Sequence, residues 1–127
     1  MIYVDSSVAL AQLLAEQRMP PAEIWEEAIS SRLIEYEVWN VIHRKGLTHS
    51  HGEPATVLLR SIDLLELTPL ALARAVDPFP RPIRTLDALH LASAFYLSER
   101  GEKVTLATYD REMHDAAKAV GLKLFKL

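Results

Sequence analysis

The chain has 127 residues, 50% of them hydrophobic and 24% charged, which is the size and composition of one folded domain. Its 14 basic and 17 acidic residues give a net charge of −3, which argues against a basic arm that holds nucleic acid by charge alone. The absence of cysteine excludes disulfides, iron–sulfur clusters, thiolate zinc sites and a cysteine nucleophile. Neither a membrane-spanning run nor a signal-peptide pattern is present, so we expect a cytoplasmic protein with no membrane partner.

Short β-prone runs alternate with helical patterns along the whole chain. Proline and glycine mark several of the boundaries between them. The predicted elements are, in order, a strand at 2–4, a helix over 8–16 capped by Ser6 or Ser7, a helix over 22–29, a short strand at 30–34, a helix over 35–45, a His-rich loop at 47–54, a helix over 55–65, a short strand at 65–68, a helix over 69–76, an extended connection over 77–84, a helix over 86–100, a strand at 104–108, a helix over 111–120 and a strand at 122–125.

This alternation predicts a single α/β domain with a mainly parallel central sheet. Side chains that follow parallel strands gather at the carboxyl edge of the sheet, where such folds bind ligands. Asp5 directly follows the first strand, and Asp110 follows the strand at 104–108. Glu37 lies just past the short strand near residue 33, and Asp87 opens the helix over 86–100. We therefore expect these four carboxylates to share one pocket.

Four carboxylates in one pocket favour a bound cation. Two of them about 4 Å apart repel each other by roughly 4 kcal/mol at an effective dielectric constant near 20. All-oxygen ligands suit Mg²⁺ or Mn²⁺, which can lower the pKa of a water molecule and support phosphodiester hydrolysis. The structural alternative is that each Asp is only a helix N-cap, and that Glu37 is a solvated acid of its first helical turn. For Asp5 this alternative is weaker, because Ser6 and Ser7 already offer caps.

Four segments of the sequence resemble the PIN-domain ribonucleases, and more closely the VapC-type toxins of bacterial and archaeal toxin–antitoxin pairs. Their order and spacing extend over nearly the whole chain, and they lie at 3–8, at 31–37 with Val38 and Asn40 following, at 84–92 and at 107–112. The resemblance implies a three-layer α/β/α domain spanning residues 1–127, with a central mainly parallel sheet. It also implies a metal-dependent endoribonuclease that hydrolyses RNA with a metal-activated water, using Mg²⁺ or Mn²⁺.

The same resemblance assigns roles to individual residues. Asp5, Glu37, Asp87 and Asp110 become the catalytic metal-binding acids, and Ser6 and Thr108 the hydroxyl residues that orient them. Glu35 is the rival of Glu37, because the short strand before them leaves the register open. Family members usually form homodimers and are blocked by an antitoxin, here a VapB-type partner, whose peptide segment presents an arginine to the acidic groove.

Two residues near Asp87 have competing interpretations. Arg84 precedes its helix and could bind a substrate phosphate, or it could simply pair with a neighbouring acid. His90 shares a helix face with Asp87 at a spacing of three residues, and a packed helical histidine is a more common role there than a metal ligand.

Two other functions remain open at this point. One is a non-catalytic binding module with the same fold, and the other is a receiver-like phosphoacceptor domain. The net charge does not oppose RNA binding once the four site acids are set aside, because 17 − 4 = 13 acidic residues then face 14 basic ones. A bound metal would supply the attraction for phosphate.

Overall fold

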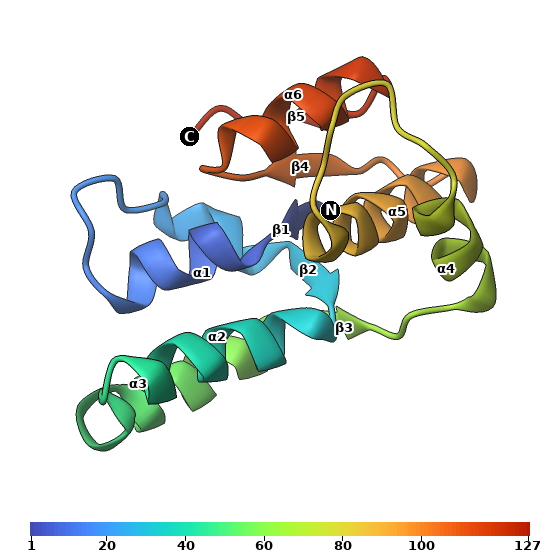
Figure 1. The fold of residues 1–127 in the computed structure, drawn as a ribbon. Coiled ribbons are helices and arrows are strands. Elements are labelled where there is room, and N and C mark those ends of the chain that lie inside the picture. The colour runs from blue at the N-terminus through green and yellow to red at the C-terminus, as the bar shows by residue number, and fades with distance from the viewer.

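The computed structural model describes residues 1–127, and its five strands form one sheet in which every pairing is parallel (Figure 1). The strands β1 (Ile2–Val4), β2 (Ala28–Ser31), β3 (Asp63–Leu65), β4 (Thr105–Ala107) and β5 (Lys123–Leu124) are arranged in the order β3-β2-β1-β4-β5. The helices are α1 (Ser6–Leu13), the 3₁₀ helix η1 (Ala22–Glu26), α2 (Leu33–Arg44), α3 (Thr48–Arg60), α4 (Pro69–Val76), α5 (Thr85–Glu99) and α6 (Arg111–Ala119).

Two hydrophobic clusters on opposite faces of the sheet produce the layered architecture. Because successive side chains of a strand point to opposite faces, Ile2 and Val4 pack with α1, α2 and α3, while Tyr3 packs with α5 and α6. Figure 1 shows α2 and α3 together on one side of the sheet and α6 on the other. The predicted three-layer α/β/α fold with a central parallel sheet is therefore confirmed.

The strand register brings the ends of β1 and β4 together. Val4 lies opposite Ala107 in the parallel pair. The next residues along the two strands are Asp5 and Thr108, so both emerge side by side at the carboxyl edge of the sheet. Ser31 ends the neighbouring strand β2 at the same edge. The topology alone thus collects polar groups from positions more than 100 residues apart.

Residues 47–54 do not form the predicted loop, because α3 begins at Thr48 and runs through them. Pro54 lies inside this helix, exposed to solvent and without a backbone donor. Ala55 and Leu59, four residues apart, are buried in the cluster shared with α2, and this packing outweighs the local polarity.

The segment around β2 also differs from the prediction. The expected helix over 22–29 is a short 3₁₀ helix that ends at Glu26, and the strand begins at Ala28 rather than at residue 30. Pairing of Ile29 with Tyr3 in the sheet decides this boundary. The third strand lies at 63–65 instead of 65–68, because Ile29 pairs with Asp63. No helix of the structure combines the length and the apolar character that a membrane crossing requires.

Candidate functional site

Asp5 is a buried carboxylate held by four hydrogen bonds. It is only 3% exposed and accepts hydrogen bonds from the backbone N–H groups of Ser7 (3.1 Å) and Val8 (3.4 Å). The hydroxyl groups of Ser7 and Thr108 donate to its two oxygens. Asp5 is therefore itself the N-cap of α1, and the expectation that Ser6 or Ser7 would cap this helix is wrong. Burial raises the pKa of Asp5, against the lowering effect of the Ser7 and Thr108 hydroxyls.

Asp110 caps the helix that follows β4. Its Oδ1 accepts a hydrogen bond from the backbone N–H of Met113 at 3.0 Å. Thr108 connects this cap to Asp5, because its Oγ1 accepts from the N–H of Asp110 at 3.0 Å while donating to Asp5 Oδ2. The structural role of N-cap thus applies to both aspartates, and both side chains are still held at the carboxyl edge of the sheet.

Glu37 lies in the second turn of α2, which begins at Leu33, two residues earlier than predicted. Ser6 donates a hydrogen bond to Glu37 Oε2 at 3.1 Å, and the His90 imidazole contacts Oε1 through Nε2. Glu35 forms an ion pair with Arg32 at 3.5 Å instead. Two helical residues separated by about 200° cannot face the same pocket, and here it is Glu37 that contacts Ser6 and His90 and whose charge acts on Asp87.

Asp87, in the first turn of α5, experiences the charges of all the other candidate acids. Burial, together with the negative charges of Asp110, Asp5 and Glu37, raises its pKa from 3.8 to about 6, while His90 acts in the opposite direction. The four carboxylates therefore form one electrostatic cluster whose negative charge is poorly compensated.

The donor set of this cluster fits a divalent cation in its chemistry. Carboxylate oxygens are the ligands of Mg²⁺ and Mn²⁺, and the raised pKa of Asp87 reflects its burial and the negative charges around it. No three of the acidic and histidine side chains are already arranged around a point that could hold an ion. Binding would therefore require at least one of these side chains to change its conformation.

The remaining predicted residue, Arg84, occupies the N-cap position of α5, where its guanidinium cannot accept a capping hydrogen bond. It is exposed and forms none of the ion pairs of the structure, whereas the neighbouring Arg81 pairs with Asp115 at 3.9 Å. The pairing with a nearby acid that the sequence left open for Arg84 is thus absent.

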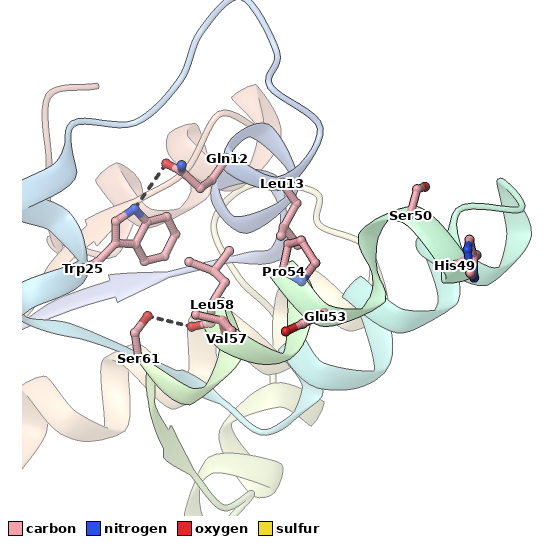
Figure 2. A pocket seen from close by; sticks show the side chains of 10 residues that line it. All are labelled: Gln12, Leu13, Trp25, His49, Ser50, Glu53, Pro54, Val57, Leu58 and Ser61. Carbon is pink, nitrogen blue, oxygen red and sulfur yellow. Dashed lines mark hydrogen bonds between the residues drawn. The ribbon is translucent and has the colours of Figure 1, made fainter.

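A large open cavity lies away from the four site acids. It measures about 780 Å³, lies between α1, η1 and α3, and includes the Trp25 indole, which donates to Gln12 at 3.3 Å (Figure 2). A cavity of about 370 Å³ instead adjoins the cluster. Its lining residues are Ser6, Leu33, Tyr36, Glu37, Asn40, Val41 and Leu86. The acidic cluster thus adjoins a smaller cavity, and its concentration of charge makes it the candidate site.

Two residues contact the cluster in ways that the sequence does not predict. Ser7 is predicted only as a cap, yet its hydroxyl donates to Asp5 and accepts from the N–H of Tyr109 at 2.9 Å. His90 is fully buried, as a packed helical residue would be, but its ring also contacts Glu37. Its spacing from Asp87 was the available signal. The contact of Tyr3 with His90 had no sequence signal, since Tyr3 reads as an ordinary strand residue.

Comparison with known proteins supports the same interpretation. A sequence model of the PIN domain matches residues 2–119. Ribonuclease VapC47 of Mycobacterium tuberculosis is 31% identical over 129 residues, covering 95% of this chain and 93% of the relative. Ribonuclease VapC46 of the same species is 33% identical over 125 residues, with the same coverage.

Two solved structures share the fold at low sequence identity. Mycobacterium tuberculosis VapC20, described as a sarcin-ricin loop cleaving toxin, matches with a TM-score of 0.65 and 16% identity over 100% of both chains. PAE2754 from Pyrobaculum aerophilum matches with a TM-score of 0.59 and 24% identity, covering 93% of this chain and 80% of that one. With the family match and the VapC relatives, the chain belongs to the PIN domain family, among the VapC ribonucleases.

Proposed function

We propose that this protein is the toxin of a VapBC-type toxin–antitoxin pair, an endoribonuclease that hydrolyses RNA phosphodiester bonds with Mg²⁺ or Mn²⁺. The observation that carries the proposal is the convergence of Asp5, Glu37, Asp87 and Asp110 in one cluster of negative charge, with the pKa of Asp87 raised to about 6. A cluster of this kind needs a cation at neutral pH, and a cation beside an open groove can bind phosphate.

The side chains of the cluster would act as metal ligands held in place by their neighbours. Thr108 and Ser7 fix the Asp5 carboxylate, and Ser6 holds one oxygen of Glu37. Asp87 has no hydrogen-bond partner among the protein groups, which leaves both of its oxygens free to bind an ion. When bound, the cation would lower the pKa of a water molecule and neutralise charge on the scissile phosphate.

Arg84 would position the RNA at this site. Its side chain is exposed, unpaired and three residues before Asp87 at the start of α5. A guanidinium in that place can donate to phosphate oxygens beside the scissile bond and fix the register of the strand without reading its sequence.

Two protein partners complete the proposal. A VapB-type antitoxin would insert a peptide segment with an arginine into the acidic groove, whose negative charge complements a guanidinium. A second copy of the chain would form a homodimer and cover apolar side chains that are exposed here, among them Leu70 (68%) and Val76 (85%). Light scattering of the purified protein measures its molar mass and so shows whether the homodimer forms.

The test is cleavage of single-stranded RNA with Mg²⁺, with Mn²⁺ and with EDTA. We expect cleavage that EDTA abolishes and that the variants Asp5→Asn and Asp87→Asn lose. Asp63→Asn is the matched control, because Asp63 is exposed at the start of β3, at the far edge of the sheet. Undiminished cleavage by both site variants would refute the assignment of the site. If both variants bind metal with full affinity and expression of the wild type causes no growth arrest, a non-catalytic binding module is favoured instead.

A further inference from the structure

A buried chain of hydrogen bonds leads from the end of β2 to the Glu37 carboxylate. The backbone N–H of Ser31 donates to Tyr3 Oη at 3.0 Å, and Tyr3 Oη lies 2.8 Å from His90 Nδ1. The opposite nitrogen of the same ring, Nε2, contacts Glu37 Oε1. Tyr3, Ser31 and His90 are all fully buried, so water does not compete for any of these groups.

The donor and acceptor groups along this series of hydrogen bonds determine which atom carries each hydrogen. A backbone N–H can only donate, so Tyr3 Oη is the acceptor of the Ser31 bond. On the other side of the His90 ring, the Glu37 carboxylate can only accept a hydrogen bond, so Nε2 carries a hydrogen and donates to it. In the neutral ring Nδ1 then carries no hydrogen, and it accepts the phenol hydrogen of Tyr3, whose oxygen lies 2.8 Å away.

We propose that Tyr3 and His90 are positioning residues for the metal site: the Tyr3 hydroxyl holds His90 in the tautomer with hydrogen on Nε2, and that N–H fixes the carboxylate of Glu37 within the acidic cluster. This inference rests on the proposed function, in which Glu37 is a metal ligand. It uses the ring of His90 as a donor and not as a ligand of the metal.

The position of His90 explains why a donor is needed there. Asp87 lies one helical turn before His90 on α5, and its charge repels that of Glu37. Left alone, the Glu37 side chain would turn away from the other acids, since three torsions are free to rotate. The His90 donor on Oε1 and the Ser6 donor on Oε2 hold it from two different helices, α5 and α1. Both oxygens are thus fixed before any ion arrives.

The tautomer is measured directly in the metal-free protein by long-range ¹H–¹⁵N NMR of the histidine rings. The His90 signal is assigned as the one that is missing from the spectrum of His90→Gln. We expect hydrogen on Nε2 alone in the wild type and a mixture of tautomers in Tyr3→Phe. Tyr96→Phe is the matched control, because Tyr96 also accepts a hydrogen bond, from Arg100, but takes no part in the hydrogen bonds between Tyr3, His90 and Glu37. A wild-type ring with hydrogen on Nδ1, or a Tyr3→Phe spectrum like the wild type, overturns the proposal.

The effect on the metal site is measured by Mn²⁺ binding, followed by the EPR signal of free Mn²⁺. His90→Gln places an amide N–H near the position of Nε2 and can still donate to Glu37, whereas the shorter His90→Asn cannot. We expect His90→Gln to bind Mn²⁺ within about threefold of the wild type and His90→Asn to bind about 10- to 100-fold more weakly. Equal loss in both variants at similar melting temperatures indicates a merely structural role and contradicts the inference.

The two measurements separate this inference from the proposed function. A wild type that binds no Mn²⁺ and cleaves no RNA overturns the proposed function, and the positioning role with it. A wild type that binds Mn²⁺ and cleaves RNA, but has the other tautomer of His90, overturns only the role of Tyr3 and His90.

Discussion

Removing the charge of Asp87 should stabilise the metal-free protein at neutral pH. The pKa of this carboxyl is raised from 3.8 to about 6 by burial and by the negative charges of Asp110, Asp5 and Glu37. Folding therefore favours its protonated form, and the ionised form costs stability. That cost is absent below the unfolded-state pKa of 3.8 and is fully present above about 6. The variant Asp87→Asn removes it by replacing the carboxylate with a neutral side chain of similar shape.

The size of the effect follows from the shift. A change of about 2 pKa units corresponds to about 3 kcal/mol as an upper bound. Asp87 is partly exposed, so water screens the repulsion, and we expect about 1 kcal/mol. For a domain of this length that amounts to a rise in melting temperature of roughly 4 °C. The amide can also donate to a neighbouring carboxylate, which acts in the same direction.

Urea unfolding in EDTA measures this difference between wild type and variant across pH 4 to 8. The advantage of Asp87→Asn should be largest above pH 6 and should decline as the pH falls towards 4, because the wild-type carboxyl then takes up its proton. Asp63→Asn, at an exposed carboxylate on the edge strand β3, should show no such trend. A variant that is less stable than the wild type at pH 7.5, or an advantage that grows on acidification, would refute the reasoning.

Three further predictions follow from the same contacts. Thr108→Val removes the donor to Asp5 Oδ2 and should lower the free energy of unfolding by about 1–2 kcal/mol in urea titrations, whereas an unchanged midpoint would mean that this hydrogen bond does not contribute. Glu37→Gln should abolish Mg²⁺-dependent RNA cleavage, whereas Glu35→Gln, which loses only a half-exposed ion pair with Arg32, should retain nearly all of it; equal losses would contradict the choice between them. Mg²⁺ at about 100 times its Kd should stabilise the wild type by about 2.7 kcal/mol at pH 7.5, and by less at pH 5, because protons then compete with the metal for Asp87. Calorimetric melting curves recorded with Mg²⁺ and with EDTA at each pH measure both values.

The identity of the candidate site was largely readable from the sequence because a parallel sheet has a simple rule. Residues that directly follow its strands emerge at one edge, so Asp5 and Asp110 could be placed together without coordinates. The prediction failed where packing outweighs local signals. The polar residues 47–54 are helical because Ala55 and Leu59 are buried on the same helix, and β2 begins at Ala28 because Ile29 pairs with Tyr3.

The sequence by itself determined the fold class, the oxygen-rich character of the site and the four acids that could form it, since each depends on local pattern and strand order. Only the tertiary structure decided how those acids are held. The helix phase of α2 separates Glu37 from Glu35, and the parallel register sets Thr108 beside Asp5. The contact between Tyr3 and His90 joins residues 87 positions apart, and such a hydrogen bond depends on distances of a few ångströms that no sequence spacing encodes.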